Sequence, residues 1–413
     1  MHKSSRAPEP SFNRRRFLQA SGLLGAAAVL GQAPVLADDT VTLPFENGER
    51  PLVKYPQKRP LIRHTTRPPQ LETPFSVFNE SVITPNDAFF VRYHLALAPP
   101  PAAELEKFRL QVKGQVKNPQ EFTVADLKSR FEPVELVAVN QCSGNSRGFS
   151  QPRMPGGQLG NGAMGNARWR GVRLSDVLQA CGLPAGVRQA TFNGMDRPVV
   201  PETPDFVKSL EIDQALDGEV MLAYSMNGED LPWLNGYPLR LVVPGHYGTY
   251  WVKHLNEITV LNEAFSGYWM SPAYRIPDNG CGFTEPGTTA KQTIPINRYN
   301  VRSFLTSLAD GAQVKVGVPL TLRGIAFDGG YGMREVVVSA DGGETWRSAR
   351  LGQDLGKYSF REWTLPFTPA VAGKLELKVK ATNRLGQSQP LEPLWNPSGY
   401  LRNVVETVRV TAV

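Results

Sequence analysis

The chain has 413 residues, including 38 Gly and 35 Pro, with 9% aromatic and 20% charged residues and a formal net charge of +7. This composition excludes a disordered chain and favours a compact, loop-rich protein of two or three domains with much β-structure. Residues 1–37 hold five basic residues against one acidic residue, so without them the net charge falls to +3. No basic run with interleaved aromatic residues is present, and nucleic-acid binding is therefore not expected.

The first 37 residues have the pattern of a twin-arginine targeting signal. Residues 13–19 read Asn-Arg-Arg-Arg-Phe-Leu-Gln, and a weakly apolar run over 20–30 and a small-residue cleavage site at 35–37 follow. The apolar run is shorter than the roughly 20 residues that span a bilayer, so no membrane span is expected. We expect a periplasmic protein exported by the twin-arginine route, which commonly carries proteins that have already received a cofactor.

Residues 38–80 are rich in proline and poorly periodic, which predicts an extended N-terminal arm. A strand is expected over 89–94, and its alternation places Phe90, Arg92 and His94 on one face. A face that combines an arginine and a histidine with phenylalanine indicates either a polar site or a half-exposed strand, because burying an unpaired charge is costly.

The apolar, β-branched run at 137–139 predicts a buried strand that delivers Cys142 to a loop of small and polar residues. Arg147 follows five residues after Cys142. A nearby cation favours the thiolate, which is the form of cysteine that binds metals. The alternative is a structural cysteine, because free cysteines are among the most buried residues.

The other two cysteines have no assigned chemistry. Cys181 ends a helix that we expect near 174–180, with Gly182 placed to cap it, and is expected to be core packing. Cys281 lies in a loop, and whether it pairs with Cys181 is left open.

Residues 235–253 predict an apolar strand, a Pro-Gly loop and a second strand. Arg240 and Lys253 share this hairpin-like unit and could together hold a phosphate, although two surface cations beside a turn are the alternative. An irregular aromatic loop over 269–277 is suited to closing a pocket.

From about residue 296 the pattern changes to short strands separated by turns, as in a β-sandwich of immunoglobulin type. Residues 374–381 alternate strictly, so one face of that strand is expected in the core. We assign this region a packing or dimerising role and no chemistry. The expected strands are 319–327, 335–339, 344–351, 360–366, 374–381 and 404–413.

Taken together, the motifs resemble the sulfite oxidase family of molybdenum enzymes, and most of all the catalytic subunits of bacterial periplasmic sulfite dehydrogenases. The resemblance is carried by the segments at 89–94, 140–147, 235–240, 251–253, 273–277 and 395–403. It implies an α+β fold: a sulfite-oxidase-type molybdopterin-binding domain of mixed β-structure with few helices over 81–294, followed by an immunoglobulin-like β-sandwich over 295–413.

The resemblance also implies roles for individual residues. Cys142 matches the thiolate ligand of molybdenum. The positions that match or lie close to the oxyanion pocket are Arg92, Tyr274, Arg402 and Arg147. The positions that match those holding one molybdopterin per chain are Phe90, His94, Asn235, Arg240, Trp251, Val252 and Lys253. The chain departs from animal members of the family at two positions. In the segment 395–403 it has Ser398 where they have an arginine, and at a pterin-holding position it has Asn235 where they have a histidine.

The implied reaction is oxidation of sulfite to sulfate by oxygen-atom transfer, with electrons leaving singly. The sequence holds no Cys-x-x-Cys-His haem-attachment motif, so the expected acceptor is a c-type cytochrome, either a subunit or a soluble partner. A homodimer through the C-terminal domain or a heterodimer with the cytochrome is expected. Three alternatives remain: a sulfane dehydrogenase subunit of a thiosulfate-oxidising complex, a methionine sulfoxide reductase, and a non-enzymatic binding module.

Overall fold

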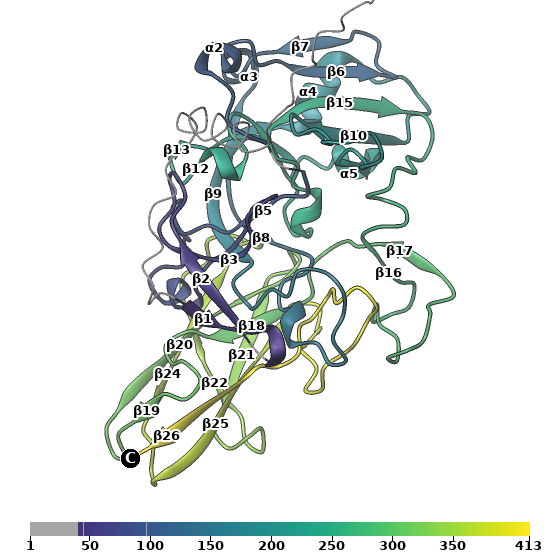
Figure 1. Cartoon of the computed structure of the whole chain (residues 1–413). Coiled ribbons are helices and arrows are strands. Elements are labelled where there is room, and N and C mark those ends of the chain that lie inside the picture. Colours follow the sequence, from purple (N-terminus) through teal and green to yellow (C-terminus); the bar gives the residue numbers. More distant parts are fainter. Residues whose placement is uncertain (1–39, 44, 96) are drawn as a thin grey trace, which may run out of the picture. The chain divides into compact units, whose positions relative to one another are not determined.

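The computed structural model describes residues 40–413 except Pro44 and Ala96, and the predicted targeting signal lies outside the described residues. Residues Thr40–Val413 form one compact unit that is mainly β-structure (Figure 1). None of the helices in this part of the chain has the length and apolar content needed to span a bilayer.

The N-terminal residues form a small antiparallel sheet with the strand order β1-β2-β3-β4-β5. Its strands are β1 (Thr40–Thr42), β2 (Glu49–Val53), β3 (Leu61–Thr65), β4 (Gln70–Glu72) and β5 (Val91–Arg92). The sheet has a core of its own around Leu61, Leu71 and Tyr93. The prediction of an extended arm is therefore wrong for these residues, because most of the prolines lie in the connections between strands.

The central domain contains two further sheets, and β5 brings the N-terminal sheet to it. The first has the order β11-β10-β15-β6-β7, and the second has the order β13-β12-β9-β8, with β14 paired to β12. The strands of the first sheet are β6 (Leu110–Gly114), β7 (Gln120–Phe122), β10 (Gln189–Gly194), β11 (Val207–Glu211) and β15 (Leu255–Leu261). Those of the second are β8 (Pro133–Gln141), β9 (Met164–Arg173), β12 (Met221–Met226), β13 (Glu229–Asp230) and β14 (Arg240–Val242).

Few helices accompany these sheets, as predicted. The α-helices are α2 (Ala102–Leu105), α3 (Val124–Arg130), α4 (Leu174–Cys181) and α5 (Ile212–Ala215). The short 3-10 turns are η1 (Phe45–Asn47), η2 (Phe75–Asn79), η3 (Arg147–Phe149), η4 (Trp233–Asn235) and η5 (Gly248–Tyr250). The predicted helix near 174–180 is confirmed, and Gly182 caps it with φ 72°.

The C-terminal region is a β-sandwich, as predicted. One sheet has the order β18-β20-β24-β23 and the other has the order β19-β26-β25-β21-β22. The strands are β18 (Arg302–Leu305), β19 (Gln313–Val314), β20 (Leu320–Phe327), β21 (Met333–Ser339), β22 (Arg347–Ser348), β23 (Arg350–Leu351), β24 (Arg361–Phe367), β25 (Gly373–Asn383) and β26 (Thr407–Ala412). Leu377 and Val379 point into a core between the sheets that includes Trp363, which confirms the predicted alternation in β25.

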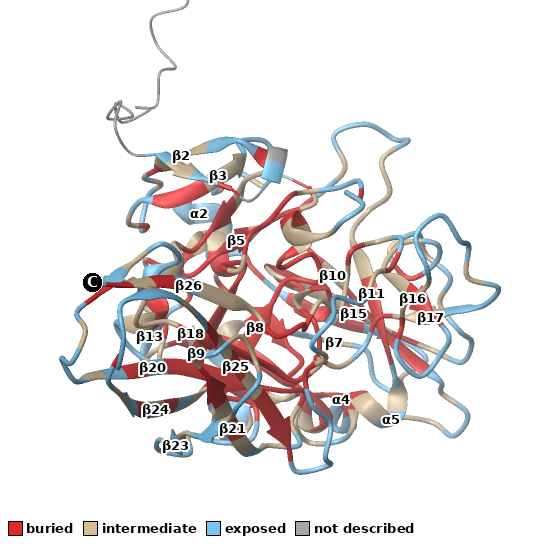
Figure 2. Ribbon diagram, turned by 90° about the horizontal axis from the view of Figure 1, so that it is seen from below, coloured by how far each residue is buried: buried red, intermediate tan, exposed pale blue. Residues whose placement is uncertain are grey.

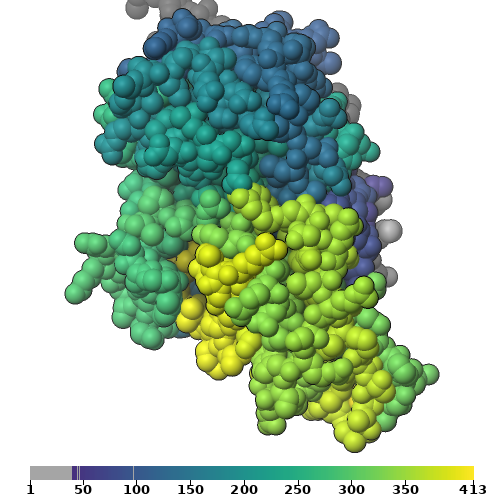
Figure 3. All heavy atoms as spheres, turned by 180° about the vertical axis from the view of Figure 1, so that it is seen from behind, coloured from purple at the N-terminus to yellow at the C-terminus, as the bar shows by residue number. Residues whose placement is uncertain are grey.

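The sandwich and the central domain share apolar core. Phe304, Phe327 and Phe360 of the sandwich belong to the large core cluster of the central domain. Figure 2 shows buried residues, in red, in strands of both the sandwich and the central domain. The strands β16 (Arg275–Pro277) and β17 (Thr293–Pro295) form a hairpin between the central domain and the sandwich in the sequence. The long loop before β26 contacts the chain between these two strands, and the C-terminal residues to which it belongs form the yellow surface in Figure 3. In this loop the Trp395 carbonyl accepts a 2.9 Å hydrogen bond from the Thr284 N–H. The shared core cluster also contains Cys142, so the sandwich packs directly against the part of the chain that carries this residue.

Candidate active site

A pocket with an empty volume of about 690 Å³, part of it open to solvent, lies where several strand ends and 3-10 turns of the central domain meet. Nine of the twelve residues singled out from the sequence line it. They are Phe90, Arg92, His94, Cys142, Asn235, Arg240, Trp251, Lys253 and Tyr274. The structure therefore brings together residues that are far apart in the sequence.

Cys142 reaches the pocket because β8 ends at Gln141 and the chain then turns. The Cys142 N–H donates to the Ala163 carbonyl at 2.9 Å, and its own carbonyl accepts from the Asn145 N–H at 3.0 Å. The residue is 9% exposed and lines the pocket. A strand end and a hydrogen-bonded turn together fix where the sulfur lies.

Arg92, His94 and Tyr274 form a chain of hydrogen bonds along one wall. Arg92 Nη1 lies 3.0 Å from His94 Nδ1, and the Tyr274 hydroxyl lies 2.6 Å from His94 Nε2. Burial, with Arg92 the nearest contributing cation, lowers the pKa of His94 well below its usual value, so the ring is neutral. Because a guanidinium can only donate, Nδ1 accepts and Nε2 carries the proton. His94 therefore donates to the Tyr274 oxygen and leaves the Tyr274 proton free to donate elsewhere.

Tyr274 is held firmly in this position. Its φ of 56° lies in the left-handed region, which non-glycine residues seldom adopt. Its ring stacks on His94 at 5.5 Å and on Tyr400 at 5.6 Å between centroids. Burial raises the pKa of the Tyr274 hydroxyl above its usual value, so it remains protonated at neutral pH.

Two further cations, Arg240 and Lys253, line the pocket. Arg240 donates to the Asn235 carbonyl at 2.8 Å, and Lys253 Nζ donates to the Arg92 carbonyl at 2.7 Å. Burial lowers the pKa of Arg240 to about 9 and that of Lys253 to about 7. The protein therefore places both charges where they are poorly solvated.

These pocket cations have no acidic partner in contact. The ion pairs formed within the described part of the chain include none of Arg92, Arg240 and Lys253. Asp196 lines the pocket too, but burial raises the pKa of its carboxyl and so weakens it as an anion. Unpaired cations around a concave surface favour an anionic ligand.

The polar atoms of the pocket also fit a ligand that combines donors, acceptors and negative charge. Four of the residues that line it have a buried side-chain atom with no hydrogen-bond partner among the described residues: Asn140 Oδ1, Ser143 Oγ, Arg240 Nε and Thr249 Oγ1. Buried polar groups are normally satisfied. A phosphorylated, nitrogen-rich heterocycle such as molybdopterin would supply acceptors for Arg240 and donors for Asn140.

Three predicted residues do not line the pocket. Val252 is in the core. Arg147 lies behind the wall: its Nε donates to the Ser398 carbonyl at 2.9 Å, and its guanidinium is 5.3 Å from the centroid of the Tyr400 ring. Arg402 Nη2 is paired with Glu406 Oε2 at 3.3 Å. Of the three arginines predicted near the oxyanion pocket, only Arg92 lines the pocket, and Arg147 and Arg402 do not.

The stretch 235–253 differs from its predicted hairpin. β14 is a strand, but Gly248–Tyr250 is a 3-10 turn, and Trp251, Val252 and Lys253 are irregular. The Leu241 N–H still donates to the Val252 carbonyl at 2.8 Å, so the two segments run side by side. The departure from a regular strand allows both Trp251 and Lys253 to reach the pocket.

Sequence reasoning missed two buried lysines beside the site. Lys58 Nζ donates to the Phe89 carbonyl at 3.0 Å and to Asn235 Oδ1 at 2.5 Å. Lys208 Nζ lies 5.0 Å from the centroid of the Tyr274 ring. Lys208 shares a strand face with the buried Leu210 in β11, which is a readable signal, whereas nothing near Lys58 in the sequence indicates burial.

No disulfide forms: Cys142 and Cys181 are free and buried, and Cys281 is free and exposed. Cys181, the last residue of α4, is in the core, as expected, and burial raises the pKa of its thiol. Cys142 is the cysteine that lines the pocket.

Comparison with known proteins gives consistent matches. Residues 97–269 match the family described as oxidoreductase molybdopterin binding domain, and residues 293–412 match the Mo-co oxidoreductase dimerisation domain. The sulfite oxidase of Gallus gallus is 34% identical over 86% of this chain and 79% of its own length, and that of Arabidopsis thaliana is 31% identical over 87% and 96%. The sulfane dehydrogenase SoxCD from Paracoccus pantotrophus has the same fold, with a TM-score of 0.70 and 22% identity over 93% of this chain and 92% of that one.

Proposed function

Because the chain belongs to the sulfite oxidase family of molybdenum enzymes, we propose that it oxidises sulfite to sulfate and passes the electrons singly to a c-type cytochrome. The observation that carries this proposal is the pocket that Cys142 lines together with Arg92, Arg240 and Lys253, none of which has an acidic partner in contact among the described residues. Such a pocket suits both an anionic cofactor and a small anionic substrate.

The residues present fit the cofactor that the family implies. Cys142 would bind the metal through its thiolate, since soft thiolate ligands suit such a centre. Arg240 and Lys253 would hold the phosphate, and Asn235 and Trp251 would hold the pterin. When bound, one molybdenum centre per chain supplies the two-electron oxygen-atom chemistry that no side chain can provide.

The side chains of the pocket bind and orient the anion. Sulfate is a dianion near neutral pH and sulfite carries one or two negative charges, so the guanidinium of Arg92 attracts the substrate and helps to hold it. The neutral His94 ring accepts from Arg92 and donates to Tyr274, which keeps the Tyr274 proton available for a substrate oxygen. A preorganised donor of this kind stabilises charge without having to reorient during the reaction.

Arg147 acts on this wall from behind. Its guanidinium faces the ring of Tyr400, and the Tyr400 ring is parallel to that of Tyr274 within 4°. Arg147 therefore supports the aromatic stack that fixes Tyr274 and adds positive potential to the pocket. Arg402 is committed to Glu406, so we propose no contact between Arg402 and the substrate.

The electrons need an external acceptor in this proposal. The sequence lacks a Cys-x-x-Cys-His motif, and a twin-arginine signal fits a periplasmic c-type cytochrome as the partner. We also propose that residues 293–412, which match a dimerisation domain, support a homodimer unless the cytochrome takes that place. Light scattering with and without cytochrome measures which assembly forms.

The test is anaerobic reduction of cytochrome c by the purified full chain with sulfite, thiosulfate or methionine as the electron donor. The proposal expects sulfite-dependent reduction and no oxygen consumption in air. Cys142→Ser should abolish the reaction, and Cys281→Ser, a matched change at the exposed cysteine, should not. Preference for a sulfane sulfur donor would favour the sulfane dehydrogenase alternative. Turnover of methionine or its sulfoxide without turnover of sulfite would contradict the proposal.

A further inference from the structure

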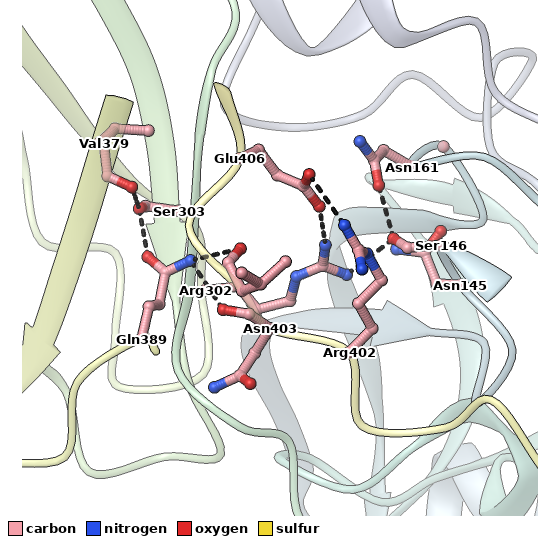
Figure 4. A network of polar contacts seen from close by, with 12 residues as sticks. Asn145, Ser146, Asn161, Arg302, Ser303, Val379, Gln389, Arg402, Asn403 and Glu406 are labelled. Atoms are coloured by element: carbon pink, nitrogen blue, oxygen red, sulfur yellow. Dashed lines mark hydrogen bonds and ion pairs between the residues drawn. The ribbon is translucent and has the colours of Figure 1, made fainter. Parts of the chain in front are cut away.

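The side chain of Arg302, at the start of β18 in the sandwich, points away from its own domain. It is among the largest fully buried side chains of the described chain, with 1% exposure, although it carries a charge. Its Nη2 lies 3.4 Å from Glu406 Oε1, and its Nη1 donates to Ser146 Oγ at 3.0 Å (Figure 4). One arm of the guanidinium therefore stays at the sandwich, and the other reaches the loop that follows Cys142.

Ser146 is fixed on three sides. Its hydroxyl accepts from Arg302 and donates to Asn161 Oδ1 at 2.5 Å, and its N–H donates to the Gly160 carbonyl at 2.6 Å. Its φ of 69° lies in the left-handed region, which a serine adopts only when its surroundings impose it. The contact from Arg302 is therefore part of what holds this turn in shape.

The turn connects Ser146 rigidly to Cys142. The Asn145 N–H donates to the Cys142 carbonyl at 3.0 Å, and Asn145 Oδ1 accepts from the Ala163 N–H at 2.9 Å. The Ala163 carbonyl in turn accepts from the Cys142 N–H at 2.9 Å. A displacement of Ser146 would pass through Asn145 and Ala163 to the sulfur-bearing residue.

The ion pair alone does not account for this arrangement. Glu406 also pairs with Arg402, so one carboxylate serves two guanidinium groups, and Arg302 needs a further acceptor. That acceptor is Ser146 rather than another group of the sandwich. Burying an arginine in this way costs free energy that an apolar residue would avoid.

We propose that Arg302 is a positioning residue through which the β-sandwich holds the Cys142 loop in its metal-binding shape. The inference rests on Cys142 being the molybdenum ligand, as the proposed function has it, but not on which substrate is oxidised. It assigns the sandwich a part in the active site, where sequence analysis gave it none.

The test compares purified full-length holoenzymes of the wild type, Arg302→Met, Ser146→Ala, the double variant and Ser303→Ala. Ser303 is the matched control, because it is the next residue of β18 but donates to Val379 within the sandwich at 3.1 Å. The readouts are molybdenum content after dialysis, the electron paramagnetic resonance signal of the half-reduced metal, kcat, KM for sulfite and Tm.

Arg302→Met should lower molybdenum retention or kcat by about 10- to 100-fold, which is typical of lost partners behind a metal ligand. Its resonance signal should change while KM for sulfite stays the same. Ser146→Ala should reproduce these changes, and the double variant should be no worse than the more affected single variant, because both remove one interaction. Ser303→Ala should lower Tm with an unchanged signal.

An unchanged signal and full metal retention in Arg302→Met, or the same losses in Ser303→Ala, would overturn the inference. If the wild type itself holds no molybdenum, the cofactor assignment fails. The rate of alkylation of Cys142 in a Cys281→Ser background then tests separately whether Arg302 holds the Cys142 loop in shape. Faster alkylation in Arg302→Met supports the positioning role, and an equal rate refutes it.

Discussion

Two groups of cations in this molecule differ in how their charge is balanced. Arg240 and Lys253 face the pocket and pair with no carboxylate among the described residues. By contrast, Arg302 at the start of β18 and Arg402 in the loop before β26 share Glu406. Burial lowers the pKa of Arg240 to about 9 and that of Arg302 to about 10, and Glu406 opposes the effect at Arg302. The first group has no carboxylate in contact within the described part of the chain, and the second has one.

The difference distinguishes a binding site from a structural contact. A buried ion pair contributes little net stability, but removing one partner leaves a costly uncompensated charge. The pocket already contains buried cations without an acidic partner in the described chain, and an anionic cofactor would lower the free-energy cost of burying them. The comparison therefore predicts opposite consequences for substitutions in the two regions.

The largest effect is expected from Arg240→Met on cofactor binding. Losing a buried charged partner should weaken retention of the molybdenum cofactor by more than about 100-fold, or ~3 kcal/mol. The free energy of unfolding of the cofactor-free chain should stay the same or rise, because an unpaired charge has been removed. Metal analysis after dialysis and urea unfolding measure the two quantities, with the exposed Arg323→Met as the control.

Glu406→Gln should have the reverse pattern. The free energy of unfolding should fall by about 3 kcal/mol, because Arg302 and Arg402 both lose their carboxylate. Glu376→Gln, which breaks the exposed pair with Arg409, should change it by less than about 1 kcal/mol. Equal urea midpoints for the two variants would remove the distinction between the two regions.

Tyr274→Phe tests a neutral group of the pocket and should matter less than a cation. Losing one hydrogen bond to a charged substrate should lower kcat/KM for sulfite by about 30-fold, or ~2 kcal/mol. Cofactor content should not change, because Tyr274 belongs to the substrate side of the pocket. A loss of molybdenum in this variant would show that Tyr274 supports the cofactor instead.

The smallest effect is the change in stability per unit of pH. Burial lowers the pKa of Lys58 to about 7, while an unfolded lysine titrates near 10.4. Between these values the unfolded chain binds one more proton, so this group makes stability rise with pH, by about 1.4 kcal/mol per unit. Lys58→Met should lower the measured slope between pH 7.5 and 9.5 by that amount in urea titrations, and the contributions of Lys208 and Lys253 should remain. The exposed Lys54→Met should keep it.

The sequence predicted the sandwich well and the pocket in part. Alternation in β25 is a local property, so its inward face could be read directly. The motifs around Arg92, Cys142 and Arg240 indicated residues that do line one pocket. The sequence did not indicate which cations have an acidic partner. Arg402 was predicted to lie at the pocket, but in the structure it pairs with Glu406 in the loop before β26.

Long-range contacts explain the remaining differences. Lys58 reaches Asn235 across 177 positions of sequence, and Arg302 reaches Ser146 across 156. Neither pair has a local pattern, because each depends on how separate sheets pack. The N-terminal sheet was missed for the related reason that short strands between prolines look irregular until they pair.

The measurement that tests the account most directly is the molybdenum and pterin content of the purified wild type, Cys142→Ser and Cys281→Ser. The account predicts one molybdenum and one pterin per chain in the wild type and in Cys281→Ser, and loss of the metal in Cys142→Ser. A metal-free wild type, or full molybdenum in Cys142→Ser, would contradict it.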